Sequence, residues 1–323
     1  MINPLLNVTS LTKHFPVRGG VFMRQTGAVH AVDNVSLTID PGQTLGLVGE
    51  SGCGKSTLGK TILQLLGSYQ GSIQFEGQEL GGLSNKKIRA LRRDIQIIFQ
   101  DPMESLNSRH TVGQIIEEPL KIHNIGDSDS RKRDVLALIK RVGLNESSLE
   151  KYPHEFSGGQ RQRIGIARAI ALKPKLVICD EPVSALDVSI QSQILNLLME
   201  LQQEMNMALL FISHDLSVVR HISDRVAVMY LGEIAETGNV QDLYANPKHP
   251  YTKALIKAIP QPVAGASINY NLMQGDVPSA INPPSGCRFH PRCLHATEQC
   301  STTAPAPETI DNHSVSCHHW RTI

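Results

Sequence analysis

Short apolar runs alternate with polar turns over the first hundred residues. Runs rich in β-branched residues predict strands, and these segments are Leu5 to Val8, Val29 to Ile39, Thr44 to Val48, Ser72 to Phe75 and Ile95 to Phe99. One helix is expected after Gly54, running to Leu66. The pattern predicts a sheet with an inserted helix.

The spacing of apolar residues becomes helical between residues 101 and 155. Apolar positions recur at helical intervals from Val112 to Ile122 and from Val135 to Val142, with almost no strand signal between. We therefore expect a helical subdomain inserted into the sheet-forming part of the chain.

Strand signals return after this insert. The runs Leu176 to Cys179 and Ala208 to Ile212 are short and continuously apolar, as in buried parallel strands. A helix between them is predicted by an apolar face made of Ile190, Ile194, Leu197, Leu198 and Leu201. Together these segments predict a strand, a crossover helix and a second strand.

The composition changes once more after about Asn246, where Pro, His, Ser and Cys become frequent and little regular structure is expected. The predicted fold is α/β with three parts. Residues 1–100 and 156–245 form the core, which begins with an antiparallel β part, residues 101–155 form the helical insert, and residues 246–323 form a Pro- and Cys-rich C-terminal extension.

Charge and hydropathy narrow the class of protein. The chain has 323 residues with 31 Lys and Arg against 30 Asp and Glu, so no basic field would gather nucleic acid or acidic lipid. No apolar run approaches the roughly 18 to 20 residues that a bilayer span needs, and Met1 to Phe15 lacks the order of a secretion signal. We expect a soluble cytoplasmic protein whose membrane role, if any, depends on a protein partner.

A glycine-rich loop carries the first chemical signal. Gly49-Glu50-Ser51-Gly52-Cys53-Gly54-Lys55-Ser56 fits the pattern G-x-x-x-x-G-K-[ST] and lies between a predicted strand and a predicted helix. Backbone N–H groups of such a loop surround a β-phosphate, and the lysine neutralises the β and γ oxygens. Lys55 is therefore predicted to bind ATP and Ser56 to hold Mg²⁺. The rest of this nucleotide-binding set is Gly49, Ser51, Gly52, Cys53, Gly54 and Thr57.

Two adjacent acids follow an apolar strand. Asp180 stands at the carboxyl end of the strand that begins at Leu176, where ligands of α/β sheets gather, and is predicted to reach the Mg²⁺ shell. Glu181 would then polarise the water that attacks the γ-phosphate. The alternative for an isolated acidic pair is a helix N-cap.

The peptide Phe156-Ser157-Gly158-Gly159-Gln160, just ahead of this strand, resembles the signature peptide of the ABC ATPase family. The resemblance implies a P-loop ATPase core in which this peptide closes over ATP held by a partner subunit. Ser157 and the following amides begin a helix whose N-terminus suits an anion. The family usually has Leu at the first position, and we expect Phe156 to affect packing only.

Further residues match family positions. Gln100 resembles the glutamine that senses Mg²⁺ and the γ-phosphate, and His214 is similar to the switch histidine. Ser184 to Asp187 resembles the loop that acts across the dimer, and Phe15 the aromatic that stacks on adenine. The resemblance thus implies catalytic roles for Glu181, His214 and Gln100.

The chain is most similar to the oligopeptide and dipeptide importers of this family, and to the second ATPase subunit type. The segments that carry this resemblance are Tyr152 to Phe156, Asp180 to Ser189, His249 to Thr252 and Gly286 to Cys293. The resemblance implies a paralogous ATPase subunit in a heterodimer, two membrane permeases, an extracytoplasmic solute-binding protein and a place at the cytoplasmic face of a bacterial inner membrane. Nickel, glutathione or another small solute is the alternative cargo, and a non-transport soluble ABC ATPase is the rival function.

Four cysteines fall near the end of the chain: Cys287, Cys293, Cys300 and Cys317. In a reducing compartment such a group suggests metal ligands before disulfides, and four thiolates suit Zn²⁺ or an iron–sulfur cluster. The third hypothesis is that these cysteines are merely reduced or prone to form disulfides. Resemblance to importer subunits with such tails favours a four-iron four-sulfur cluster. Most of the nearby histidines are expected to be solvated surface groups: His290, His295, His313, His318 and His319.

Overall fold

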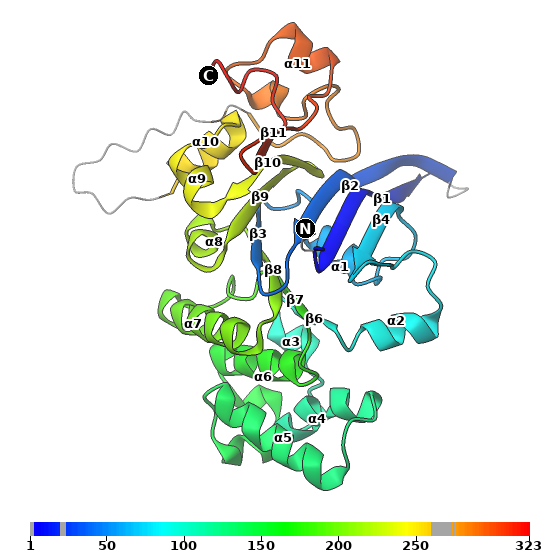
Figure 1. The fold of residues 1–323 in the computed structure, drawn as a ribbon, viewed down its shortest axis with the longest axis vertical. Coiled ribbons are helices and arrows are strands. Elements are labelled where there is room, and N and C mark those ends of the chain that lie inside the picture. Colours follow the sequence, from blue (N-terminus) through cyan, green and yellow to red (C-terminus); the bar gives the residue numbers. More distant parts are fainter. Residues whose placement is uncertain (1–2, 20–23, 260–272, 274) are drawn as a thin grey trace, which may run out of the picture. The chain divides into compact units, whose positions relative to one another are not determined.

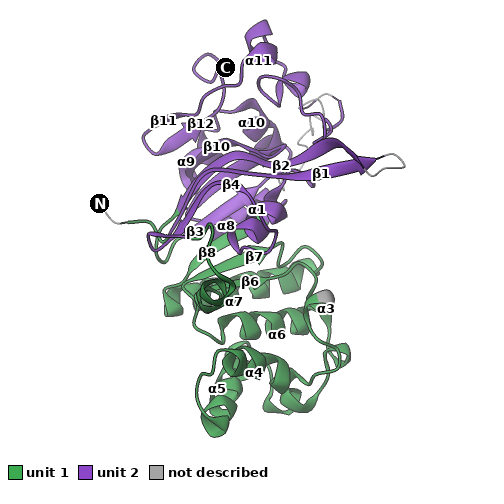
Figure 2. Ribbon diagram, turned by 90° about the vertical axis from the view of Figure 1, so that its right-hand side faces the viewer, with its two compact units in different colours: residues 1–5, 39–43, 80–212 green, residues 6–38, 44–79, 213–323 purple. Residues whose placement is uncertain are grey.

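The structure, a computed structural model, describes residues 3–19, 24–259, 273 and 275–323 (Figure 1). Contacts between residues divide the chain into two compact units (Figure 2). The first unit contains residues 1–5, 39–43 and 80–212, and the second contains residues 6–38, 44–79 and 213–323. The three-part division expected from the sequence stays a prediction, and within its extension residues 260–272 and 274 lie outside the described residues.

An antiparallel sheet in the second unit confirms the predicted antiparallel β part. Its strands, in spatial order, are β2 (Arg24–Ile39), β1 (Leu6–Gly19), β4 (Gln70–Phe75) and β5 (Gln78–Glu79). Leu6 of β1 is paired with Phe75 of β4, and both side chains are buried. This burial of alternate positions fixes the register of the pair.

The second unit also contains a group of strands around β3 (Thr44–Val48). The buried strand β3 runs parallel to β9 (Arg225–Tyr230), and β9 pairs antiparallel with β10 (Glu233–Asn239). The helices of the unit are α1 (Lys55–Ile62), α8 (Leu216–Ile222), α9 (Val240–Ala245), α10 (Pro250–Lys257), a 3₁₀ turn (His290–Arg292) and α11 (Glu298–Thr302).

The C-terminal extension is more regular than expected. Strands β11 (Glu308–Ile310) and β12 (His313–Val315) pair antiparallel, and β12 pairs in turn with β10. The expectation of little regular structure is therefore wrong for the end of the chain. Strands of three residues are too short for an alternating pattern to be recognised in the sequence. They form because they pair with a neighbouring strand.

Three parallel strands form the sheet of the first unit, and they confirm the predicted strands in this part of the chain. They are β6 (Ile95–Ile98), β7 (Leu176–Asp180) and β8 (Ala208–Ser213). Helix α7 (Val188–Met205) connects β7 to β8 and buries Ile194, Leu198 and Leu201. The predicted strand, crossover helix and strand are thus confirmed.

The first unit also contains several helices. They are α2 (Asn85–Leu91), α3 (Pro102–Ser105), α4 (Val112–Ile122), α5 (Ser128–Arg141), 3₁₀ turns at Glu146–Glu150 and Pro153–Glu155, and α6 (Gly158–Ile170). Helices α4, α5 and α6 contact one another. The prediction for α4 is confirmed, whereas α5 begins at Ser128 rather than Val135. Its first turn is polar, and the Asp127 carboxylate caps the N–H groups of Asp129 and Ser130.

Two further boundaries differ from expectation. Helix α1 ends at Ile62 instead of Leu66, because Gln64 takes a left-handed backbone conformation (φ 56°) that stops the helix. Strand β6 ends at Ile98, two residues before Gln100. Among the residues that the structure describes, no helix combines the length and apolar character needed to cross a bilayer.

Candidate functional site

The glycine-rich loop of the second unit connects β3 to α1. Gly54 has a φ of 107°, and a Cβ atom there would lie 1.9 Å from the carbonyl oxygen of Ala31 in β2. Only glycine satisfies both conditions. Helix α1 begins directly at Lys55, so the loop is followed by the positive end of a helix dipole.

Lys55 is the central charge of this loop. Its side chain is only 4% exposed, and Nζ donates to the carbonyl oxygens of Gly49 (2.8 Å) and Glu50 (3.0 Å). Burial raises the pKa of the nearby Cys53 thiol, although the Lys55 ammonium acts in the opposite direction. A helix N-terminus with a buried ammonium is suited to binding an anion such as a phosphate group.

The other predicted residues of this loop are placed around that charge. Ser51 and Gly52 are exposed at its tip, while Ser56 and Thr57 are half-buried in the first turn of α1. Phe15, in β1, is also half-buried, and the ammonium of Lys13 lies 5.2 Å from its ring centroid. A partly exposed ring of this kind can stack on a planar base.

His214 lies in the second unit, immediately before α8. Its side chain is exposed. Asp215 follows it as the N-cap of α8 and accepts hydrogen bonds from the N–H groups of Ser217 and Val218. The cap fixes the start of α8 and with it the backbone that carries His214.

The first unit brings together two of the predicted catalytic residues. Nε2 of Gln100 donates to Oε2 of Glu181 over 3.1 Å. Asp180, at the end of β7, is 4% exposed, and the N–H of Glu181 donates to the carbonyl oxygen of Ile212 in β8 (3.0 Å). Glu181 has a φ of 47°, a sparsely populated conformation that is enriched at active sites.

The Ser157 peptide begins α6, as expected. The Ser157 hydroxyl accepts from the N–H of Gln160 (3.4 Å), and the Gln160 side chain accepts from the N–H of Ser157 (3.1 Å). Such a capping box leaves other N–H groups of the first turn available. Ser157, Gly158 and Gln160 are exposed, whereas Phe156 is buried, as the packing role predicted for it requires.

Asp187 is the exposed N-cap residue of α7. The loop before it is held by Gln191, whose side chain donates to the carbonyl oxygen of Leu186 (2.9 Å). The next residue, Val188, leaves 78% of its surface exposed. Such a loop offers both a carboxylate and an apolar side chain to a partner.

The four tail cysteines line one cavity in the second unit. None forms a disulfide. Burial, and then the neighbouring thiols of Cys317, Cys300 and Cys293, raise the pKa of Cys287 to about 12. A Cβ atom on Gly286 (φ 67°) would lie 2.4 Å from the carbonyl oxygen of Cys300, so glycine lets the two cysteine segments approach each other.

The cavity is also lined by His290, His295, His318 and His319. The expectation that most tail histidines are solvated surface groups is wrong, because His295 alone of the five is exposed. The fifth, His313, is 7% exposed and donates to the buried Glu236 carboxylate. The error arises because the tail histidines are covered by residues that are distant in the sequence, whereas the prediction used only their sequence neighbours.

Two contacts to the glycine-rich loop were not predicted. Arg292 forms an ion pair with Glu50, and the Tyr251 hydroxyl accepts from the N–H of Glu50. Both residues belong to the two segments, His249 to Thr252 and Gly286 to Cys293, that carried the importer resemblance. That signal marked the segments but gave no indication of their contact.

Comparison with known proteins adds two matches to family profiles. Residues 32–184 match the ABC transporter profile, and residues 235–300 match the profile of the oligopeptide/dipeptide transporter C-terminal region. Over 97% of both chains, the sequence is 52% identical to the oligopeptide transport ATP-binding protein AppF of Bacillus subtilis. It is 51% identical to the oligopeptide transport ATP-binding protein OppF of Escherichia coli, over 97% of this chain and 95% of that protein.

Solved structures give the same fold. The cbiO1 protein of Clostridium perfringens, part of the ABC transporter complex cbiONQ, matches with a TM-score of 0.64 and 31% identity over 75% of this chain and 91% of that chain. A dimeric structure of MJ0796, described as a bacterial ABC transporter cassette, matches with a TM-score of 0.65 and 27% identity over 73% of this chain and 98% of that one.

Proposed function

The chain belongs to the oligopeptide/dipeptide family of ABC transporter ATP-binding proteins, and from this premise we propose that it powers the uptake of short peptides by hydrolysing ATP. The observation that carries the proposal is the identity of 51–52% over nearly the whole length of oligopeptide transport ATP-binding proteins. The match to their C-terminal region supports a peptide cargo over a generic one.

Lys55 is proposed to neutralise the β- and γ-phosphates of ATP. Its buried ammonium already sits among the carbonyl oxygens of the loop, where low exposure strengthens its interaction with an incoming anion. The N–H groups of Gly52, Cys53 and Gly54 would surround the β-phosphate, and Ser56 and Thr57 would follow it in α1. Phe15 would stack on the adenine, a contact that contributes about 1 to 3 kcal/mol for bases on aromatic rings.

Glu181 is proposed to orient the water that attacks the γ-phosphorus. Gln100 holds its carboxylate in place through the 3.1 Å hydrogen bond. His214 would hold the γ-phosphate, while Ser56, Gln100 and Asp180 would hold Mg²⁺. When bound, Mg²⁺ supplies neutralisation of charge on the phosphate oxygens. In such phosphoryl transfer, catalysis depends on positioning and charge rather than on covalent steps of the protein.

The exposed start of α6 is proposed to meet ATP held by a second ATPase subunit. Ser157, Gly158, Gly159 and Gln160 would complete that second subunit's site, and Asp187 would act across the interface. We propose a paralogous partner, hence a heterodimer, together with two permeases and an extracytoplasmic solute-binding protein. The chain would then lie at the cytoplasmic face of an inner membrane through its permeases.

The cysteine cavity is proposed to hold metal. Four converging thiols that form no disulfide fit a soft-metal site. We propose that Cys287, Cys293, Cys300 and Cys317 would hold a four-iron four-sulfur cluster, with Zn²⁺ as the alternative. The resemblance to importer subunits with such tails supports the cluster. When bound, such a cluster would link the four cysteine segments and supply a redox-active group.

The proposed function is tested in vesicles that contain the complete transporter. Glu181→Gln should keep ATP binding and abolish both ATP turnover and peptide uptake, because it removes the carboxylate but keeps the shape. The control is Glu150→Gln, which changes an exposed glutamate of the same unit and should leave both activities intact. ATP turnover at the wild-type rate by the Glu181 variant would remove Glu181 from its role.

The cargo is tested in the same vesicles. ATP-dependent uptake of labelled di- and oligopeptides should exceed that of glutathione and of nickel. A preference for either of these would support the alternative cargo, and ATP turnover without uptake of any solute would support the non-transport ATPase.

A further inference from the structure

The segment Cys287–Cys293, here called the cysteine loop, lies between two cysteines of the cavity and carries two arginines. Arg288 is 8% exposed and Arg292 is 7% exposed. Nη atoms of both arginines form ion pairs with carboxylates outside the C-terminal extension. A buried guanidinium is costly unless it is paired, so the partners of these arginines decide where the loop can lie.

Arg292 binds the glycine-rich loop (residues 49–56), here called the phosphate loop. Its Nη1 and Nη2 donate to the two carboxylate oxygens of Glu50 over 2.7 and 3.1 Å, and Glu50 is the second residue of the glycine-rich loop. A bidentate pair of this kind fixes orientation as well as distance. The main chain of Glu50 is held too, because its N–H donates to Tyr251 and its carbonyl oxygen accepts from Lys55.

Aromatic rings join the cavity to the same place. Phe289, on the cysteine loop, lines the cavity and packs against Tyr230 (5.3 Å between ring centroids) and Tyr251 (5.4 Å). Tyr230 lies under the Arg292 guanidinium at 5.9 Å. The wall of the cavity and the support of Glu50 are therefore one packed cluster, in which a shift of the cysteine loop moves both.

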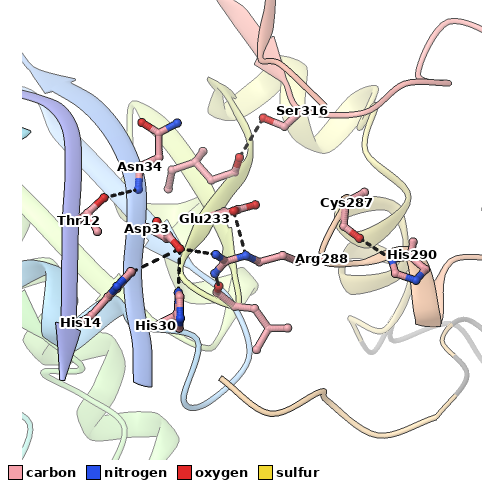
Figure 3. A network of polar contacts seen from close by, with 12 residues as sticks. Thr12, His14, His30, Asp33, Asn34, Glu233, Cys287, Arg288, His290 and Ser316 are labelled. Carbon is pink, nitrogen blue, oxygen red and sulfur yellow. Dashed lines mark hydrogen bonds and ion pairs between the residues drawn. The ribbon is translucent and has the colours of Figure 1, made fainter. Parts of the chain in front are cut away.

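Arg288 provides a second attachment, which Figure 3 shows. Its Nη2 donates to Asp33 (2.5 Å), its Nε donates to Glu233 (2.9 Å), and its Nη1 donates to the carbonyl oxygen of Leu231. The N–H of the following residue, Gly232, donates to the carbonyl oxygen of Cys53 in the phosphate loop (2.8 Å). Both arginines of the cysteine loop are thus connected to the phosphate loop, Arg292 directly and Arg288 through the neighbouring Leu231–Gly232 backbone.

We propose that Arg292 is a positioning residue for the phosphate loop, and that through it the occupancy of the cysteine cavity by metal sets the affinity for ATP. The inference rests on the proposed function. Cys287 and Cys293 would hold the metal at the two ends of the cysteine loop. The loop fixed in this way would keep Arg292, and through it Glu50, in the conformation that receives the phosphates. Coupling between two binding sites is reciprocal, so ATP must also tighten the hold on the metal by the same factor.

The experiment uses the complete transporter, purified without oxygen, with its iron and zinc content measured. Arg292→Gln should weaken binding of a fluorescent ATP analogue and raise KM for ATP about tenfold while changing kcat less than twofold. A tenfold change in affinity corresponds to about 1.4 kcal/mol. Arg292→Lys keeps the positive charge but cannot donate two parallel hydrogen bonds to one carboxylate. Its ATP affinity should lie between those of the wild type and Arg292→Gln. Glu308→Gln, which breaks an exposed ion pair of the same extension with Arg321, is the control and should match the wild type.

The second readout is the rate at which a chelator removes the metal. Saturating ATP should slow this loss in the wild type and should not do so in Arg292→Gln. If that variant does not fold, Glu50→Gln breaks the same ion pair from the other side and should give the same two changes.

Wild-type ATP affinity in a folded Arg292→Gln would overturn the positioning role. Equal protection of the metal by ATP in both proteins, or a cavity without metal in the wild type, would overturn the coupling. A wild type that binds no ATP would instead overturn the proposed function.

Discussion

Replacing Glu236 by glutamine should cost the protein several kcal/mol of stability. This glutamate of β10 is fully buried. One carboxylate oxygen accepts from Nε2 of His313 (2.6 Å) and from the N–H of Lys248 (2.7 Å), and the other accepts from the N–H of His249 (2.9 Å). Burial alone would raise the pKa of Glu236, but the hydrogen bonds from His313 and the backbone outweigh it and lower the pKa.

The magnitude follows from counting acceptors. A glutamine in this place has one oxygen, and its amide nitrogen must face at least one of the three donors. A hydrogen bond to a charged group contributes about 1.5 to 3 kcal/mol, and an unsatisfied buried donor costs about 1 to 3 kcal/mol. We expect the free energy of unfolding to fall by about 2 to 4 kcal/mol, which lowers the melting temperature by roughly 4 to 16 °C at about 2 to 4 °C per kcal/mol.

Thermal unfolding followed by circular dichroism measures this effect. The control is Glu308→Gln, whose carboxylate is paired with Arg321 at the surface, where an ion pair contributes about 0 to 1 kcal/mol. Its melting temperature should stay within about 4 °C of the wild type.

The pH dependence gives a second check. Because the pKa of Glu236 is lowered in the folded state, its stabilisation is complete above the unfolded value of about 4.3 and is lost as the pH falls through the folded value. The gap between wild type and Glu236→Gln should therefore be widest near neutral pH and shrink below about pH 4.3. Equal melting temperatures, or a gap that stays constant as the pH falls, would refute the reasoning.

Three further substitutions test separate parts of the structure. Gly54→Ala should abolish ATP binding, because its Cβ would lie 1.9 Å from a backbone carbonyl oxygen of β2, whereas Gly165→Ala, with open space around the new Cβ, should not; equilibrium binding of a fluorescent ATP analogue distinguishes them. Phe156→Leu removes part of a buried side chain and should cost about 0.5 to 2 kcal/mol of unfolding free energy while leaving ATP turnover within about twofold, because the residue is expected to act through packing only. Tyr251→Phe removes the acceptor of the Glu50 N–H and should cost about 1 to 3 kcal/mol of unfolding free energy and weaken ATP binding, and an unchanged affinity would contradict the role of that hydroxyl.

The sequence predicted the fold where a pattern is long or chemically distinctive. The buried strands β3, β7 and β8 and helix α4 followed from continuous apolar runs or from helical spacing. The start of α5 was placed too late, because a polar first turn has no apolar period and its helix is stabilised by a cap. Strands β11 and β12 were missed, since pairing with β10 and not their own sequence defines them.

The site shows the same limit. Local motifs identified Lys55, Asp180 and Glu181, because phosphate chemistry imposes residue types at fixed spacing. The hydrogen bond from Gln100 to Glu181 spans 81 positions, and the ion pair from Arg292 to Glu50 spans 242. No periodicity or spacing reports contacts of that range, although the segment that contains Arg292 was already marked by its resemblance to the importers.

The C-terminal extension is attached to the rest of the second unit by charged and hydrogen-bonding side chains. Three cationic or donor side chains of the extension meet buried or half-buried carboxylates of the rest of the second unit: Arg288 with Asp33, Arg292 with Glu50 and His313 with Glu236. Apolar packing would attach an extension at lower cost, because desolvating a charged pair consumes much of its attraction. Charged pairs instead impose one arrangement, and removal of the extension would leave three carboxylates without these partners, one of them in the phosphate loop. These pairs support the proposal that the extension positions the nucleotide site, and its contribution should be measured in ATP affinity as well as in stability.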